Sequence, residues 1–212
     1  MTQEIRLALF GPPGAGKGTQ ANLLKEKLRV THISSGELFR RNLQNRTPLG
    51  LTAAEYMEQG LLVPDKVTID IVLETVLSIN SEDGFILDGF PRNPVQAQAL
   101  EEALKRRSRD LDKVAHIDVP ESELVRRLGG RFNCSQCQTP YNQDHVPPTK
   151  LGEDAGEDGT PCCAQCGGEL YQRADDSPEA VQRRLEVYRN ETAPVLDFYR
   201  ERGLLVDVSG SE

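Results

Sequence analysis

A glycine-rich segment near the N-terminus has the residue types and spacing that bind phosphate groups. Residues 11–19 read GPPGAGKGT and directly follow an apolar run. Glycines let the backbone N–H groups turn inward towards phosphate oxygens, and the N-terminus of a following helix adds partial positive charge. Lys17 adds a full charge that can reach the β- and γ-phosphates. The segment departs from the GxxxxGK[ST] pattern only at Gly18, after which Thr19 supplies the hydroxyl one residue late, so it predicts a phosphate-binding loop.

Four of the five cysteines form two CxxC pairs. Cys134 and Cys137 make the first pair, Cys163 and Cys166 make the second, and 25 residues separate them. Two such turns can direct four thiolates towards one tetrahedral metal site, and Cys162 could replace Cys163 with CxxxC spacing. The alternatives are disulfides, which a reducing cytosol disfavours, and a redox-active pair, which two matched pairs disfavour. The pattern predicts a structural metal, and zinc fits four thiolates better than iron.

Charged side chains accompany both motifs. Asp88 and Arg92 directly follow an apolar strand pattern, and an acid there can hold Mg²⁺ beside phosphates, directly or through water. Further arginines flank the cysteine-containing segment or follow it, and these are Arg127, Arg131, Arg173 and Arg184. Mobile insertions often carry arginines over a phosphoryl-transfer site and exclude water from it. The pattern favours phosphoryl transfer to a phosphate acceptor, which needs no general base, and so we expect no proton-transfer role for His32, His116 or His145.

The composition fits a cytoplasmic enzyme. The formal net charge is −8, which disfavours nucleic acid as a partner. Of the 25 basic residues 18 are arginine, whose planar fork suits bidentate phosphate binding. No apolar run reaches the length of a membrane span, and the N-terminal residues lack a signal-peptide pattern. We therefore expect a cytoplasmic location, with no nucleic-acid or membrane partner.

Short apolar runs alternate with amphipathic segments along the chain. The runs predict strands at 5–10, 31–34, 84–87, 113–119 and 204–208. One helix is predicted to begin with Ser35 as its N-cap. The others are predicted at 19–30, 49–59, 65–78, 94–106, 120–128 and 178–202, the last interrupted at Pro194. Between residues 129 and 171 the periodicity disappears. The alternation predicts an α/β fold with a parallel sheet covered by helices on both faces and a ligand at the carboxyl ends of its strands.

These motifs together resemble the adenylate kinase family, in its long bacterial form with a metal-binding lid. The matching segments are 11–20, HISSGELFR at 32–40, DGFPR at 88–92, Gly130-Arg131, the two CxxC pairs, QRADD at 172–176 and RRL at 183–185. They span nearly the whole chain in the family's order. The resemblance implies a P-loop NTPase-type core with a five-stranded sheet, formed by residues 1–34, 64–128 and 172–212. It also implies an NMP-binding insertion at 35–63 and a zinc-binding lid at 129–171.

The resemblance further implies reversible phosphoryl transfer from Mg-ATP to AMP, giving two ADP, by a protein that we expect to be a monomer. The residues expected to be catalytic are Lys17, Arg92, Arg131, Arg173 and Arg184. Those expected at ATP are Gly14, Ala15, Gly16, Lys17, Gly18, Thr19, Arg127, Arg131, Pro140 and Tyr141. Those expected at AMP are Ser35, Gly36, Arg40, Leu61, Leu62, Val63, Gly89, Arg92, Gln96, Arg173 and Arg184. Thr19 and Asp88 are expected at Mg²⁺, and Cys134, Cys137, Cys163 and Cys166 at Zn²⁺.

Two departures and two alternatives accompany this interpretation. Phe132 stands where the family often has a second arginine, and residues 208–210, expected at the adenine-binding turn, match less closely because similar proteins continue with a further helix. The acceptor could instead be UMP, CMP or GMP, although the cysteine-containing lid favours AMP. A zinc-ribbon module joined to an NTPase switch is the second alternative, and the acidic net charge counts against it.

Overall fold

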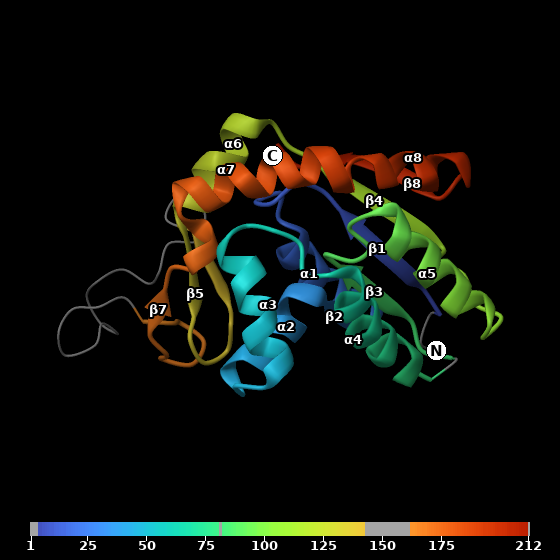
Figure 1. Ribbon diagram of the computed structural model, residues 1–212, viewed down its shortest axis with the longest axis horizontal. Coiled ribbons are helices and arrows are strands. Elements are labelled where there is room, and N and C mark those ends of the chain that lie inside the picture. The colour runs from blue at the N-terminus through green and yellow to red at the C-terminus, as the bar shows by residue number, and fades with distance from the viewer. Residues whose placement is uncertain (1–3, 81, 143–161, 212) are drawn as a thin grey trace.

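A five-stranded parallel sheet forms the centre of the molecule (Figure 1). The computed structural model describes residues 4–80, 82–142 and 162–211. The strand order is β2-β3-β1-β4-β8, with β1 at Arg6–Phe10, β2 at Thr31–Ser34, β3 at Phe85–Asp88, β4 at Lys113–Asp118 and β8 at Leu205–Ser209. The predicted fold class is confirmed, and the strand bounds differ from those expected by one residue at most.

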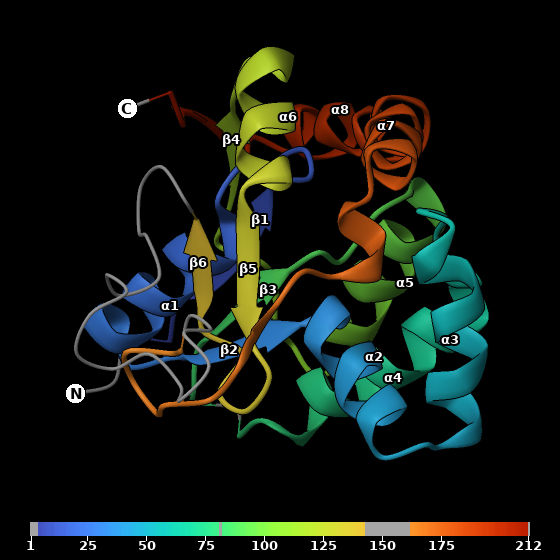
Figure 2. The same ribbon diagram turned by 90° about the vertical axis from the view of Figure 1, so that its left-hand side faces the viewer.

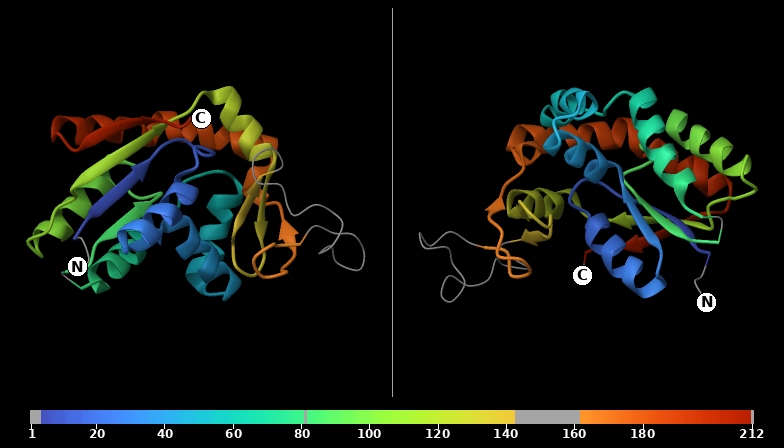
Figure 3. Two further views of the ribbon diagram at one scale, coloured as in Figure 1. Left: turned by 180° about the vertical axis from the view of Figure 1, so that it is seen from behind. Right: turned by 90° about the horizontal axis from the view of Figure 1, so that it is seen from below.

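Helices cover both faces of this sheet, as Figures 1 and 3 show. Helix α1 (Lys17–Leu28) packs on one face, where it meets Leu7 and Leu9 of β1. Helices α4 (Asp65–Ser78), α5 (Pro94–Lys105) and α8 (Pro194–Glu201) pack on the other face, against Ala8 and Phe10. Because successive strand residues point to opposite faces, β1 contributes to both cores. Its carboxyl end, and the loop that follows, are thereby held from two sides.

The helical segment predicted at 178–202 is interrupted as expected. Helix α7 (Pro178–Val187) passes through a π-helical turn at Tyr188–Thr192 before α8 begins at Pro194. Proline has no backbone N–H to donate within a continuous helix, which accounts for the change in pattern. Helix α6 (Glu121–Gly129) packs against α7 through Leu124, Leu128, Val181 and Leu185.

Helices α2 (Ser35–Gln44) and α3 (Pro48–Glu58) form a separate layer beside the carboxyl ends of the strands. Their backbones cross closely at Gly50, where an added Cβ would lie 2.2 Å from the carbonyl carbon of Asn42. The expectation that Ser35 caps α2 was wrong. Ser34 is the N-cap, since its hydroxyl accepts from the Glu37 N–H, whereas the Ser35 hydroxyl donates to the Gly89 carbonyl at 2.6 Å.

A small antiparallel sheet lies where the sequence shows no periodicity (Figure 2). Its order is β6-β5-β7, with β5 at Arg131–Cys134, β6 at Pro140–Asn142 and β7 at Leu170–Tyr171. Such short strands are too brief for a readable alternation. His145 lies outside the described residues. Within the described ranges, no helix has the length and apolar character to cross a membrane.

Candidate functional site

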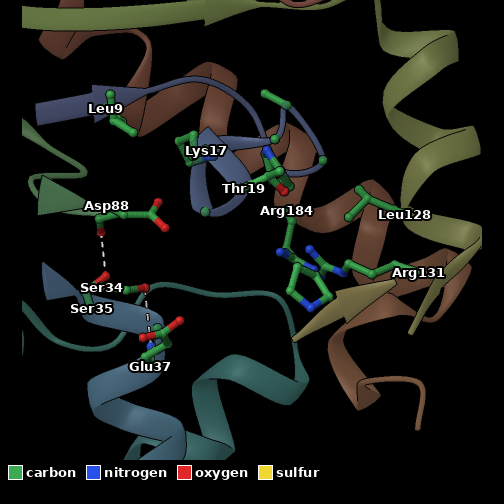
Figure 4. A pocket seen from close by; sticks show the side chains of 18 of the residues that line it. Leu9, Lys17, Thr19, Ser34, Ser35, Glu37, Asp88, Leu128, Arg131 and Arg184 are labelled. Carbon is green, nitrogen blue, oxygen red and sulfur yellow. Dashed lines mark hydrogen bonds between the residues drawn. The ribbon is translucent and has the colours of Figure 1, made fainter. Parts of the chain in front are cut away.

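A cavity of about 780 Å³ opens at the carboxyl ends of the parallel strands. Its walls come from the glycine-rich loop, the α2–α3 layer, the small sheet and Arg184 of α7 (Figure 4). Every residue that the resemblance assigns to ATP, AMP or Mg²⁺ lines this one cavity, from Gly14 in the loop to Arg184 on α7. The individual role of each residue stays a prediction, but their proximity is a property of the fold.

The glycine-rich loop has the conformation that a phosphate site requires. Gly14 and Gly16 have φ values of +85° and +91°, a region that side chains with a Cβ rarely adopt. Helix α1 begins at the next residue, Lys17, so its free N–H groups point into the cavity. The Lys17 Nζ donates to the carbonyls of Gly11 at 2.7 Å and Pro12 at 2.9 Å. The lysine is thus folded over the loop, within reach of a phosphate bound there.

Burial changes the ionisation of Lys17. Desolvation lowers its pKa to about 8, and the Asp88 carboxylate opposes this shift while Arg92, Arg184 and Arg131 reinforce it. Its low pKa means that the charge of Asp88 does not fully offset the burial of the ammonium and the repulsion from the three arginines. A polyanionic ligand would raise the pKa again, since it favours the charged form.

Asp88 lies at the end of β3 with His32 of β2 beside it. His32 Nε2 is 3.5 Å from Asp88 Oδ2, and the histidine side chain is 4% exposed. Burial raises the pKa of Asp88, but His32, Lys17 and Arg92 outweigh it and the net shift is downward. An ionised carboxylate at this position is a suitable Mg²⁺ ligand. The sequence analysis did not predict that His32 lies beside Asp88. This contact could have been expected only if the two short strands that carry these residues had been predicted to pair side by side.

Two acids hold the arginines on the side of the cavity nearest the small sheet. Arg131 makes a bidentate pair with Asp176, at 2.8 and 2.5 Å. Arg184 also contacts Asp176 at 2.9 Å and reaches Asp175 at 3.1 Å. The Asp176 side chain is fully buried, so the contacts fix both guanidiniums, which converge in Figure 4. The sequence placed these acids beside Arg173 but did not count them as site residues.

The cavity carries an excess of positive charge. Lys17, Arg40, Arg92, Arg127, Arg131, Arg173 and Arg184 line it, against the carboxylates of Glu37, Asp88 and Asp175. Burial lowers the pKa of Arg173 to about 9, and the charges of Arg131 and Arg40 add to this shift. The pKa values of Arg40 and Arg92 are also lowered, chiefly by burial. In a chain of net charge −8, this concentration of cations marks a site for several phosphates.

Gln96, which is predicted to read the base of AMP, lines the cavity, and this role stays a prediction. The residue is 1% exposed, and both ends of its side-chain amide are engaged. Its Oε1 accepts from the Arg92 N–H at 2.8 Å, and its Nε2 donates to Asp65 Oδ1 at 2.8 Å. These bonds fix the backbone of Arg92, whose Nε donates to the Gly89 carbonyl at 2.8 Å.

Arg127 lies at the end of the cavity away from Arg92, where several hydrogen bonds hold it. Its Nε donates to Glu123 at 2.7 Å, and its Nη2 donates to the Gly210 carbonyl at 2.8 Å. Asn142 on β6 donates to the Arg127 carbonyl at 2.8 Å. Arg127 therefore connects α6, the small sheet and the end of β8.

The four CxxC cysteines converge at one end of the small sheet. Their sulfurs all lie within 4.8 Å of one another. Zn–S bonds of about 2.3 Å in a tetrahedron separate the sulfurs by roughly 3.8 Å, so this arrangement fits a zinc ion. The cluster contains Cys163, whereas Cys162 makes an isolated bridge with Glu169, which resolves the choice between the two.

The ionisation of the cluster also fits a cation. Burial opposes ionisation of Cys163, but hydrogen bonds from Tyr141 and from backbone N–H groups lower its pKa to about 6. A backbone hydrogen bond from Gly168 lowers the pKa of Cys166, but hydrogen bonding with Cys134 and Cys137 together with burial outweighs it and raises the pKa to about 12. Four thiolates cannot be charged together at this distance without a positive ion among them. The Tyr141 hydroxyl, expected near ATP, is 3.2 Å from Cys163 Sγ and accepts from the Ala164 N–H at 2.9 Å.

Comparison with known proteins gives consistent matches. The family profile described as "Adenylate kinase" matches residues 9–204. The adenylate kinase of Carboxydothermus hydrogenoformans is 47% identical to this chain over 98% of its length and 93% of its own. The adenylate kinase of Caldicellulosiruptor bescii is 45% identical over the same shares. That of Streptomyces avermitilis is 47% identical over 97% of this chain and 90% of its own.

Proposed function

The chain belongs to the adenylate kinase family, so it transfers a phosphoryl group between ATP and AMP, and we propose that it does so in the single cavity described above. The observation that carries this proposal is the convergence of a phosphate loop and six further cationic side chains at the carboxyl ends of the strands. The relatives' names do not favour UMP, CMP or GMP as the acceptor, nor a nucleic-acid-binding module.

We propose that ATP binds at the end formed by the glycine-rich loop and Arg127. The loop N–H groups and Lys17 would bind the β- and γ-phosphates, and the base would lie against Arg127 and residues 208–210. AMP would bind at the α2–α3 end, with its phosphate on Arg92 and its base near Leu61, Leu62 and Val63. The two phosphate chains would then meet in front of Lys17.

The chain's own residues supply positioning and charge. Arg131, Arg173 and Arg184 would neutralise the oxygens of the transferring phosphoryl group, in an orientation that Asp175 and Asp176 maintain. Closure of the lid, residues 129–171, over the cavity would exclude water and so prevent hydrolysis of ATP. The attacking phosphate oxygen of AMP is already ionised at neutral pH, and the bridging oxygen of ATP leaves as an ionised terminal oxygen of ADP. The residues therefore need only align the two nucleotides.

Two metal ions complete the proposal. Thr19 and Asp88 would hold Mg²⁺, directly or through water, and this ion neutralises charge on the ATP phosphates when bound. Cys134, Cys137, Cys163 and Cys166 would hold Zn²⁺, whose four thiolate ligands leave no open position, so its role is structural. We further propose that the protein works in the cytoplasm and as a monomer, since the described residues of one chain bring the phosphate loop and six arginines to one cavity.

A coupled assay tests the function. Purified protein is given ATP and Mg²⁺ with AMP, UMP, CMP or GMP in turn, and ADP formation is followed. We expect turnover with AMP and at least about a hundredfold lower kcat/KM with the others, since a site that hydrogen-bonds one base leaves polar groups unpaired with another. Lys17→Met is the matched control, because it deletes the charge at the transferring group and should lower turnover by about two to three orders of magnitude. Equal activity with UMP would contradict the proposed acceptor.

A further inference from the structure

His116 is the centre of a polar cluster that the reaction described above does not use. It lies on β4, directly opposite Asp207 of β8 in the register of this parallel pair. Its Nδ1 is 2.8 Å from Asp207 Oδ1, and its Nε2 is 3.2 Å from the Tyr188 hydroxyl on the π-helical turn. The imidazole is 14% exposed. One side chain therefore joins the sheet, its last strand and the turn between α7 and α8.

The strand that this cluster contacts is an edge strand, held by its pairing with β4 and by Leu205 on one face. Among the described residues, β8 is at the edge of the sheet and pairs with β4 alone. On its other face Val206 and Val208 are 44% and 47% exposed, so they bury little apolar surface. A terminal element with few buried contacts opens at low free-energy cost, and a cross-strand pair to a partly buried histidine raises that cost.

The end of β8 is also part of the cavity wall. Val208, Ser209 and Gly210 line the cavity near Arg127. The Gly210 N–H donates to the Asp118 carbonyl at 2.8 Å, and the Gly210 carbonyl accepts from Arg127 at 2.8 Å. Any displacement of β8 along β4 therefore moves this wall and the acceptor that orients Arg127. The effect is confined to one end of the cavity, because Arg92 and the α2–α3 layer lie at the other.

We propose that His116 is a positioning residue for the ATP end of the site, acting through Asp207 and Tyr188 to hold residues 208–210 in place. This inference rests on the proposed function, since it takes that end of the cavity to receive the base of ATP. The cluster accommodates either protonation state of the imidazole. With Nδ1 protonated, His116 donates to Asp207 in both states, while Nε2 accepts from the tyrosine when neutral and donates to it when charged.

The groups facing His116 keep this arrangement intact at neutral pH. Burial and the charge of Asp118 raise the pKa of Tyr188 to about 12, so the phenol retains the proton that it donates to a neutral imidazole. The carboxylates of Asp207 and Asp118 are the acidic groups that approach the cluster from β8 and β4. We therefore expect the hydrogen bonds of His116 to Asp207 and Tyr188 to persist across the neutral pH range.

Dissociation constants and kcat of three variants test the proposal. His116→Leu removes both hydrogen bonds, and we expect the dissociation constant for ATP to rise about 3- to 10-fold, with that for AMP and kcat changing less than about twofold. His116→Asn retains a donor near the Nδ1 position and should recover most of the ATP affinity. Val206→Thr is the matched control, since it alters the opposite face of β8 without touching the cluster and should leave all three quantities unchanged.

Several results would overturn the proposal. Equal weakening of ATP and AMP in His116→Leu, or no weakening of either in a folded protein, would show that the cluster has no role specific to the ATP end. If His116→Leu does not fold, Asp207→Asn replaces it, because Asp207 is 61% exposed and its loss removes only the charge of the pair. Failure of the unaltered protein to transfer phosphoryl groups to AMP would instead contradict the proposed function, so the two failures are distinguishable.

Discussion

Single residues in this cavity carry charge under conditions that normally suppress it. Lys17 is buried against a loop of carbonyls and N–H groups, and its neighbours include three arginines and one aspartate. Asp88 remains ionised because His32, Lys17 and Arg92 surround it. Such groups respond strongly to an incoming polyanion, since binding replaces the water that they lost on folding.

The lowered pKa of Lys17 predicts a pH dependence of ATP binding. In the free protein the ammonium loses its proton as the pH rises through about 8. Bound phosphates favour the charged form, so ATP binding takes up a proton above that pH and the affinity falls, by at most about tenfold per pH unit. Calorimetric titration between about pH 7 and pH 9.5, in buffers of different ionisation enthalpy, measures both effects. Lys17→Arg keeps the charge and should flatten the profile; an unaltered slope in that variant would assign the effect to another group.

Arg92 predicts a separation between the two nucleotides. Its guanidinium lies at the α2–α3 end, fixed through Gln96 and Gly89. Arg92→Ala removes charge-assisted hydrogen bonds to the acceptor phosphate, so AMP should bind about 10- to 100-fold more weakly. The dissociation constant for ATP should change less than about twofold. If ATP weakens and AMP does not, the two nucleotides occupy the opposite ends from those proposed.

At the scale of elements, the α2–α3 layer and the small sheet each have a close local contact that restrains them. The α2–α3 layer has a glycine where its two helices cross, and the small sheet has four sulfurs from two loops gathered at one end, where we propose that zinc binds. Among the described residues, the apolar clusters of both parts are small. The cluster of the α2–α3 layer buries Phe39, Ala53 and Val63, and that of the small sheet buries Tyr141 with two of the cysteines. Local restraints therefore contribute more to the stability of such parts than they would beside a large core.

Gly50→Ala tests the crossing of α2 and α3. The added Cβ would lie 2.2 Å from a backbone carbon of Asn42, so the helices must separate. We expect a loss of about 2 kcal/mol in the free energy of unfolding and a Tm lowered by roughly 4–8 °C. Gly129→Ala is the control, because a Cβ there meets no atom within 4 Å and helix propensity improves. Thermal melts followed by circular dichroism make the comparison, and equal Tm values for both variants would contradict it.

The cysteine variants test the metal site. The purified protein should contain about one zinc per chain, and Cys163→Ser should lose it, since Cys163 belongs to the four-sulfur cluster. Cys162→Ser should retain the zinc. Loss of the metal should lower thermal stability first in the lid, with a smaller effect on turnover at low temperature, because the zinc holds structure and leaves the reaction to other groups. Metal analysis with hydrogen exchange measures this, and full zinc in Cys163→Ser would exclude the proposed ligand set.

At the scale of the whole molecule, three parts that are distant in sequence close around one cavity. The phosphate loop, the α2–α3 layer and the small sheet each contribute one wall. Asp176 contacts both Arg131, the first residue of β5, and Arg184 of α7. These partners lie 45 and 8 residues from Asp176 along the chain, so the contacts connect the small sheet to α7. Occupation of the cavity by a ligand that spans both ends should therefore stabilise the whole fold.

A bisubstrate analogue, with two adenosines joined by five phosphates, tests this coupling. It should bind with a stoichiometry of one per chain and exclude both ATP and AMP. At about a thousand times its dissociation constant it should add about 4 kcal/mol to the free energy of unfolding, which corresponds to a Tm increase of roughly 8–16 °C. Calorimetry and a thermal melt provide the two readings. Simultaneous binding of the analogue and AMP would show that the acceptor site lies elsewhere.

The sequence by itself determined the local features of this protein. The phosphate loop, the parallel strands and the CxxC turns each depend on residues close together in the chain, so spacing and periodicity reveal them. The break before Pro194 follows from the missing N–H of one residue. The membership of the sheet, and the cavity at its carboxyl edge, followed from the alternation of strands and helices.

Only the tertiary structure decided which distant side chains meet. The pairing of Arg131 with Asp176, of His32 with Asp88, and of His116 with Asp207 across 91 residues depends on strand register and helix packing. The choice of Cys163 over Cys162 depends on which sulfur a turn directs inward, and Gln96 turned out to be enclosed by partners on two other segments. Spacing along the chain carries no information on such contacts, because they are selected by the whole set of packed neighbours.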